Sequence, residues 1–374
     1  MTAQSRFRIA AAVAALIAPL GLVAATVAPA DAAVKKHKHD VTIYKVEKFV
    51  KLKGVATHTP GSSTFDGSLS CTAPTDHALD GMWLVQSVDR YEPPYVDPND
   101  PDDDPEIPPI SDPPPAPGEF NDLRDVFTWW SYPETGAGNG AKWAFKLQNF
   151  AQGDAQVKLW ITCVKGSTSA TNVHAHKIQV SDGVMAPGPN TVNGRGSYEW
   201  QWGCPTNDSY FVAPGFKITN MVRSRLVASY PKRVGGLEKW VWDFYGPGGS
   251  TMNYYGKCIY RETSAELGNP NTHRHAIRMQ HMPSYTGTHY DYSPGEHPER
   301  VRYTCDEDNP DFHGFKAAVG WFWMEHHEHF WFIGMEPQPK TREFSFWNTH
   351  HADPQHVAIG AFCINSRTGN PTAP

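Results

Sequence analysis

Charge is scarce in this chain: Asp, Glu, Lys and Arg make up 19% of its 374 residues, and the formal net charge is −6. No basic patch of the kind that nucleic-acid binding requires is present, so nucleic acid is not an expected partner. Beyond the N-terminal thirty-odd residues, no apolar run approaches the roughly 18 residues of a membrane-spanning helix. No G-x-S-x-G elbow, P-loop, dinucleotide fingerprint or H-E-x-x-H pair occurs, and we therefore expect a protein that is not an enzyme.

Aromatic residues and turn formers are abundant instead. The chain holds 13 Trp, 15 Tyr, 18 Phe, 31 Gly and 32 Pro. A coiled coil or a disordered chain does not carry this composition. Chains of this length that are rich in turns and aromatics build several small β domains, so the composition predicts an all-β protein.

The N-terminal residues predict export. Arg6 and Arg8 precede an apolar stretch over 9–28, and an A-x-A sequence at 30–32 is typical of a signal-peptide cleavage site. We interpret residues 1–33 as a signal peptide and expect a secreted protein, extracellular or associated with the cell surface. Outside the cytosol, an even number of cysteines without a C-x-x-C motif favours disulfides.

One sequence pattern occurs three times. Each copy opens on H-x-H-x-[VI]-x-[IVM], reaches a first cysteine at the end of an alternating run, and closes on C-[VI]-x-x-x-T. The H-x-H pairs are His37/His39, His174/His176 and His273/His275. Pairing the cysteines within each copy predicts the disulfides Cys71–Cys163, Cys204–Cys258 and Cys305–Cys363.

The spacing of the copies predicts three tandem units of about 100 residues, the size of a small β-sandwich. We name them repeat 1 (34–168), repeat 2 (169–268) and repeat 3 (269–374). Their length, strand alternation and cysteine placement resemble immunoglobulin-like domains, a resemblance that implies a β-sandwich with one disulfide in each repeat. Ile161 and Ala361 depart from that family, because a tyrosine is typical two residues before the second cysteine.

Repeat 1 is longer than the others because of an insertion over 92–122. This segment holds ten acidic residues and eleven prolines but no Lys or Arg, which predicts an extended surface loop or a disordered arm. Calcium is an alternative, since hard cations take carboxylate oxygens. No calcium-loop motif is present, however, and the prolines oppose wrapping around an ion.

The H-x-H pairs are candidate metal ligands. In a strand, residues i and i+2 share one face, so each pair would continue the apolar face of its strand. Two imidazoles placed in this way can share one ion, with Zn or Cu as the expected metals, and strand H-x-H pairs do so in α-carbonic anhydrases. The alternative is neutral, hydrogen-bonded histidines at a junction between repeats.

Repeat 3 holds 12 of the 18 histidines. His326, His327 and His329 lie in an aromatic run, and we expect them at an exposed hairpin tip. Such a cluster is either sensitive to metal and pH or simply a solvated loop.

These features favour a non-enzymatic structural or binding protein, with self-association or a cell-surface component as its expected partner. The pattern that repeats consists of cysteines, H-x-H pairs and aromatics, whereas an enzyme needs only one active copy. Two alternatives stay open. One is an extracellular metal-binding protein that uses the H-x-H pairs, and the other is a secreted hydrolase of polysaccharide or cell wall, which would need a catalytic pair of carboxylates.

Overall fold

The computed structural model describes most of the chain from residue 37 onward. The described residues are 37–55, 63–89, 123–136, 138–170, 174–181, 184–185, 190–191, 196–220, 222–235, 237–246, 248–265, 273–280, 288–293, 298–305, 314–325, 329–349 and 354–372. The predicted signal peptide (1–33) and the acidic insertion (92–122) lie outside them. No helix in these residues is long and apolar enough to cross a membrane.

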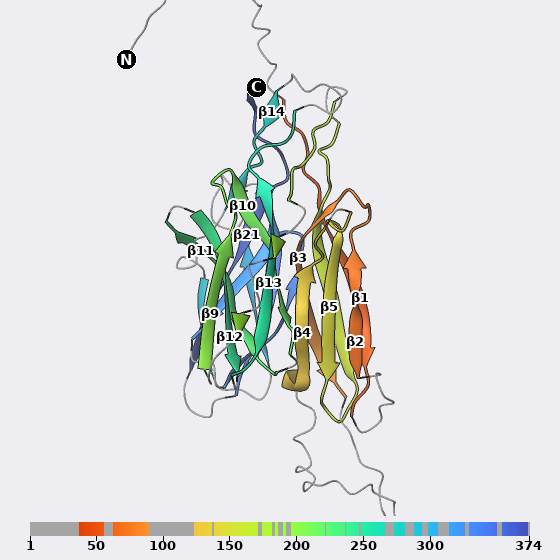
Figure 1. The fold of residues 1–374 in the computed structure, drawn as a ribbon, viewed down its shortest axis with the longest axis vertical. Coiled ribbons are helices and arrows are strands. Elements are labelled where there is room, and N and C mark those ends of the chain that lie inside the picture. The colour runs from red at the N-terminus through yellow and green to blue at the C-terminus, as the bar shows by residue number, and fades with distance from the viewer. Residues whose placement is uncertain are drawn as a thin grey trace, which may run out of the picture. The chain divides into compact units, whose positions relative to one another are not determined.

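The chain folds as an all-β protein, as its composition predicts (Figure 1). Repeat 1 contributes β1 (Ile43–Leu52), β2 (Thr64–Ser70), β3 (His77–Val88), the 3-10 helix η1 (Leu123–Asp125), β4 (Val126–Pro133), β5 (Lys142–Asn149) and β6 (Ala155–Val164). Repeat 2 contributes β7 (Val184–Met185), β8 (Asn190–Thr191), β9 (Gly196–Gly203), β10 (Ser209–Ile218), β11 (Arg225–Val234), β12 (Leu237–Gly246) and β13 (Thr251–Tyr260). Repeat 3 contributes β14 (Arg274–His275), β15 (Met279–Gln280), β16 (Thr288–Tyr292), β17 (Glu299–Thr304), β18 (Phe315–Met324), β19 (Phe330–Pro337), β20 (Thr341–Asn348), β21 (Gln355–Asn365) and β22 (Pro371–Thr372).

Each of the three large sheets combines strands from two repeats. Their strand orders are β1-β6-β3-β19-β20-β17, β2-β5-β4-β10-β13-β7 and β15-β21-β18-β11-β12-β9, and β8 and β16 pair with β13 and β21. The three junctions between repeats are therefore β3 with β19, β4 with β10, and β11 with β18, all antiparallel. Each junction pairs the strand equivalent to β3 (β3, β10 or β18) with the strand equivalent to β4 (β4, β11 or β19) of another repeat. The three repeats therefore close into a ring with approximate threefold symmetry.

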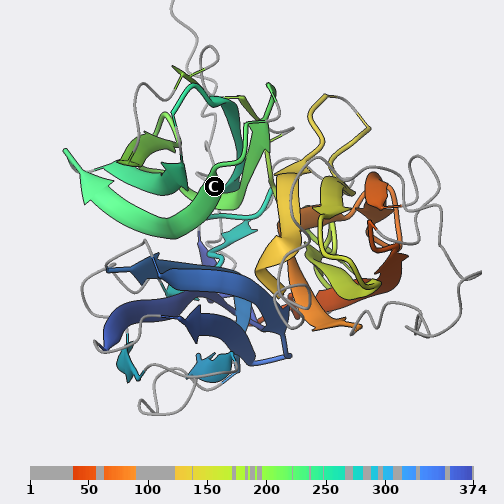
Figure 2. The ribbon, with the colours of Figure 1, turned by 90° about the horizontal axis from the view of Figure 1, so that it is seen from below.

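Figure 2 shows this ring along its axis, with three groups of strands around a common centre. The register keeps the symmetry in detail: a bulge skips one residue just before the junction in β4, β11 and β19. The skipped residues are Trp129, Val227 and Ile333, which are 2%, 0% and 3% exposed. A bulge bends a strand and increases its twist. The three repeats therefore bend the strand at equivalent positions, just before it meets the neighbouring repeat.

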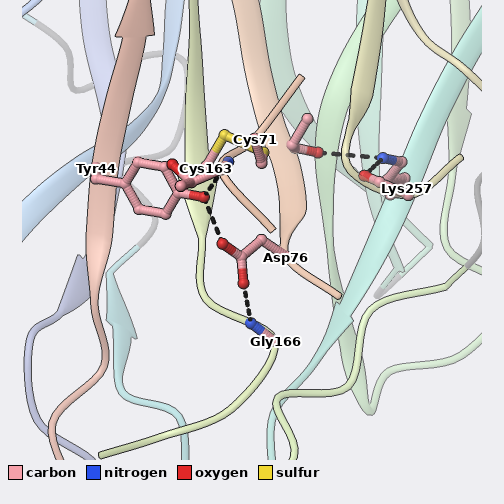
Figure 3. The surroundings of a disulfide bond; sticks show 9 residues. Tyr44, Cys71, Asp76, Cys163, Gly166 and Lys257 are labelled. Carbon is pink, nitrogen blue, oxygen red and sulfur yellow. Dashed lines mark hydrogen bonds between the residues drawn. A yellow bond between two sulfur atoms is a disulfide. The ribbon is translucent and has the colours of Figure 1, made fainter. Parts of the chain in front are cut away.

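A disulfide joins the two sheets of every repeat. The bonds are Cys71–Cys163, Cys204–Cys258 and Cys305–Cys363, and each first cysteine follows a strand of one sheet while the second lies in a strand of the other. These pairs are the ones that pairing within each repeat predicts. Beside Cys71, the Tyr44 hydroxyl donates to Asp76, and Asp76 also accepts from the Gly166 N–H at 3.1 Å (Figure 3).

Aromatic side chains fill the core. At one equivalent core position, repeats 1 and 2 hold a tryptophan and repeat 3 holds a different residue. Trp143 and Trp240 are fully buried and donate their indole N–H to Ser131 at 2.8 Å and Ser229 at 2.9 Å. In repeat 3 the equivalent residue in the register is Arg342. A tryptophan whose N–H has a partner is well suited to a core, whereas a buried arginine needs a counter-ion.

Asp80 supplies that counter-ion across the junction between repeats 3 and 1. Its Oδ2 lies 3.7 Å from Arg342 Nε and accepts the Gly320 N–H at 2.9 Å, and both side chains are almost fully buried. Burial raises the pKa of Asp80 to about 6, and the Arg342 guanidinium opposes that rise. Repeats 3 and 1 are not consecutive in the chain, so non-covalent contacts hold their junction, and this ion pair is one of them, beside the pairing of β3 with β19.

Candidate metal centre

The three H-x-H pairs meet at one point, although the first is 137 residues from the second and 236 residues from the third. We name all six residues the six-histidine cluster. Its outer triad is His37, His174 and His273, which are partly buried. Its inner triad is His39, His176 and His275, each with 0% exposure. Each repeat gives one histidine to each triad, so the cluster follows the threefold symmetry of the ring.

The six rings are arranged as an octahedron. They form three opposite pairs: His37 with His176, His39 with His273, and His174 with His275. All other pairs of rings have centroids 4.7 to 5.2 Å apart, mostly in an edge-to-face arrangement. Six points with equal separations between all but opposite members define an octahedron, and here each opposite pair takes one member from each triad.

The nitrogen atoms are spaced as ligands of one ion would be. His37 Nε2 lies 3.1 Å from His174 Nε2 and 3.1 Å from His273 Nε2. An octahedron with that edge has its centre about 2.2 Å from each vertex, close to the ~2.0–2.1 Å of a zinc–imidazole bond. Ligand atoms of His37, His39, His174, His273 and His275 all lie within 4.8 Å of one another. This group of ligand atoms could hold one metal ion.

Backbone carbonyls orient the inner triad. The Nδ1 atoms of His39, His176 and His275 lie 2.9, 3.0 and 3.0 Å from the carbonyl oxygens of Ser169, Ser264 and Gly369. A carbonyl only accepts hydrogen bonds, so each Nδ1 carries the proton and each Nε2 carries a lone pair. Metal-binding histidines have this arrangement, in which a bond from the second ring nitrogen fixes the tautomer and the ring orientation.

Three threonines, which the sequence reasoning did not assign to the site, hold the backbone of the inner triad. His39, His176 and His275 donate their backbone N–H to the Oγ1 of Thr368, Thr168 and Thr263 at 3.0, 3.1 and 3.0 Å. The N–H of each threonine returns to the carbonyl of the same histidine at 2.9 Å. These threonines close the C-[VI]-x-x-x-T pattern, so a signal for them was present in the sequence, but it carried no information about their partner.

Burial disfavours the charged form of two of the inner imidazoles, those of His39 and His275. Burial lowers the pKa of His275 to about 4, against the opposing effect of the hydrogen bond to Gly369, and burial also lowers the pKa of His39. Within the described part of the chain, the buried Nε2 atoms of His39 and His275 have no hydrogen-bond partner. A buried acceptor without a partner typically costs about 1–3 kcal/mol, and an ion at the octahedral centre would satisfy both atoms.

The H-x-H pairs lie outside the long strands in which we expected them. His37 and His39 precede β1, whose first residue is Ile43, and His275 lies in the two-residue strand β14. Single antiparallel bridges, such as Asp40 with Arg367, hold these extended segments instead. The two-residue alternation of burial is nevertheless present at these positions. In each repeat, a buried aliphatic residue lies two positions after the buried inner histidine.

Of the other predicted histidine candidates, His329 alone lies within the described residues, and it is not part of the group that could hold an ion. His329 is exposed, and its carbonyl accepts from Thr349. The prediction that these histidines lie in a hairpin between two aromatic strands is wrong, because the flanking strands β18 and β19 belong to different sheets. His326 and His327 lie outside the described residues, as does the calcium alternative at 92–122.

Comparison with known proteins gave no match: no protein-family profile fits the sequence, and no curated protein is significantly similar to it.

Proposed function

We propose that this protein binds one divalent first-row transition-metal ion through the six imidazoles of the six-histidine cluster. The observation that carries the proposal is the octahedral arrangement of the six rings, in which His37 Nε2 lies 3.1 Å from the Nε2 atoms of His174 and His273. Carbonyl bonds to Nδ1 support it, because they fix the tautomer that leaves Nε2 available. Hydrogen-bonded histidines alone do not account for the cluster, since the buried Nε2 atoms of His39 and His275 would remain without donors.

The donor set defines the chemical class of the ion. Imidazole suits Zn, Cu, Fe and Ni, whereas Ca and Mg take oxygen ligands and Cu(I) favours sulfur. The group of ligands contains only histidines. Six imidazoles complete the coordination of an octahedral ion and leave no position for substrate or water. Closed coordination of this kind supports holding an ion rather than catalysis at it.

We further propose that the protein is exported and works outside the cytosol, as a structural or binding protein of the cell surface or medium. Three disulfides support this setting. The arrangement of each repeat as two sheets joined by a disulfide supports the immunoglobulin-like interpretation of the repeats. The bound ion would serve this function by joining all three repeats at one point.

Metal analysis of protein purified without a histidine tag tests the proposal. After incubation with a mixture of Mn, Fe, Co, Ni, Cu and Zn salts and removal of free ions, we expect about one ion per chain. His39→Ala should abolish stoichiometric binding, and His37→Ala, in the more accessible outer triad, should weaken it without endangering the fold. His356→Ala is the control, because His356 is exposed and bonded to Asp291. Wild-type protein without tight metal, or wild-type binding by both the His37 and the His39 variants, would contradict the proposal.

A further inference from the structure

We infer that the six-histidine cluster selects ions that favour six-coordinate octahedral geometry, with Ni²⁺ preferred over Zn²⁺ and Co²⁺ bound in octahedral form. This inference rests on the proposed metal function and adds the identity of the ion. Its basis is the number and symmetry of the ligands, which are set by the ring of repeats and do not depend on the affinity of any single histidine.

The threefold symmetry determines which coordination geometries fit. Two triads of equivalent imidazoles, one from each side of the centre, give a trigonal antiprism, which is an octahedron viewed along its threefold axis. The centroid separations of 4.7 to 5.2 Å show no group of rings set apart from the others. Cu²⁺ favours square-planar or tetragonal geometry, with four ligands distinct from the other two. A threefold arrangement divides six ligands into three and three and opposes that distortion.

Zinc is disfavoured for a different reason. Structural zinc sites are almost always tetrahedral with four ligands. A zinc ion in this cluster would use one triad and one further ligand, so at least two imidazoles would stay uncoordinated in a partly or fully buried place. An ion that takes all six donors leaves no such group.

The inner triad cannot easily rearrange to suit a tetrahedral ion. Each inner histidine is held by three hydrogen bonds: one at Nδ1, one at the backbone N–H and one at the carbonyl. For His275 these bonds go to Gly369 and Thr263, and the lengths lie between 2.9 and 3.0 Å. All of these partners lie on the C-terminal turns of the repeats, which the strands β6, β13 and β21 position. Turning the His275 ring would therefore break its Nδ1 bond to Gly369, and shifting its backbone would break the two bonds to Thr263 of the preceding repeat.

The usual order of metal affinities shows why nickel and zinc are the ions to compare. Sites of ordinary geometry bind divalent ions in the order Mn, Fe, Co, Ni, Cu, with Zn below Cu. Nickel and zinc are then separated mainly by geometry, so competition between these two ions measures the six-coordinate preference. We expect the six-histidine cluster to bind nickel at least about ten times more tightly than zinc.

Two measurements test this inference on the full chain. The apoprotein is first loaded with Co²⁺ alone, and we expect the weak visible bands of six-coordinate cobalt rather than the intense blue bands of four-coordinate cobalt. The apoprotein is then equilibrated with equal excesses of Ni²⁺ and Zn²⁺, and the bound metals are counted after removal of free ions. We expect a bound nickel-to-zinc ratio of at least about ten.

A matched variant separates geometry from affinity. His37→Ala with His174→Ala leaves four imidazoles, and the three inner ones among them retain their Nδ1 bonds to backbone carbonyls. Its cobalt spectrum should become intense, and its nickel-to-zinc ratio should fall toward unity. Intense cobalt bands and equal nickel and zinc in the wild-type protein would overturn the inference while leaving the proposed metal function standing. No stoichiometric uptake of any of these ions would overturn both.

Discussion

His39 and Thr368 lie 329 residues apart in the sequence and are joined by two hydrogen bonds. The His39 N–H donates to Thr368 Oγ1 at 3.0 Å, and the Thr368 N–H donates to the His39 carbonyl at 2.9 Å. The pair links the beginning of repeat 1 to the end of repeat 3. The same two bonds join repeat 1 to repeat 2 and repeat 2 to repeat 3, so the metal centre and the closure of the ring depend on the same contacts.

Thr368→Val should weaken metal binding without removing a ligand. Valine has nearly the shape of threonine but cannot accept the His39 N–H, which leaves a buried donor without a partner at a cost of about 1–3 kcal/mol. Partners that orient a metal ligand typically contribute 10- to 100-fold in affinity. Isothermal titration with Ni²⁺ measures the change. Thr219→Val is the control, since Thr219 bonds Thr251 far from the cluster, and an equal loss of affinity in both variants would contradict the assignment.

Chelation should lower the melting temperature of the protein, and returning the ion should restore it. An ion that binds only the folded state at 100 times its Kd adds about 2.7 kcal/mol to the free energy of unfolding. Differential scanning calorimetry with and without a chelator measures this effect. The His176→Ala variant should melt at the same temperature under both conditions. A chelator effect of equal size in this variant would show that the stabilising ion binds elsewhere.

Asp80→Asn should destabilise the protein by about 3–5 kcal/mol, because it leaves the buried Arg342 guanidinium without a counter-ion. Chemical denaturation of the two proteins measures the difference. Asp66→Asn is the control: Asp66 forms an exposed pair with Lys146 at 3.5 Å, and such pairs contribute about 0–1 kcal/mol.

Replacing the whole buried pair should recover most of that loss. Asp80→Leu with Arg342→Met removes both charges and keeps the side-chain volume approximately, and such replacements are often neutral or stabilising. Repeats 1 and 2 support this expectation, since Trp143 and Trp240 occupy the position of Arg342 without an ion pair. A double variant as unstable as Asp80→Asn would mean that the loss comes from packing around Gly320 rather than from the unpaired charge.

Removing the Cys71–Cys163 disulfide should cost slightly more than removing Cys204–Cys258. The sequence separations are 92 and 54 residues, and in the chain-entropy model these loops contribute about 4.6 and about 4.2 kcal/mol. Denaturation of the two double-alanine variants gives the comparison. Retention of wild-type stability by either variant would contradict this account.

The repeats in the sequence predicted the all-β class and the right cysteine pairs. They did not predict that the sheets are shared between repeats, because nothing in a strand such as β4 marks β10 as its neighbour rather than another strand of its own repeat. For the same reason the sequence showed three separate H-x-H pairs and not one site. His37 and His273 come within 3.1 Å only when the ring closes, and closure is a property of long-range pairing that local patterns do not encode.

Sequence alternation also placed the histidines in long strands, whereas His37 and His39 precede β1 and His275 lies in the two-residue strand β14. Single bridges and the threonine bonds hold the extended segments there. Thr168, Thr263 and Thr368 repeat as clearly as the histidines do, but a repeated threonine does not indicate what it bonds. Only the structure pairs each one with the histidine of the neighbouring repeat.

The most direct test of the central claim is X-ray absorption spectroscopy of the nickel-loaded protein. The octahedral cluster predicts a first coordination shell of six nitrogen atoms at about 2.1–2.2 Å, with the outer-shell scattering of imidazole rings. His37→Ala should reduce the number of imidazoles by one. A shell of four ligands, or one dominated by oxygen atoms without imidazole scattering, would contradict the six-histidine site.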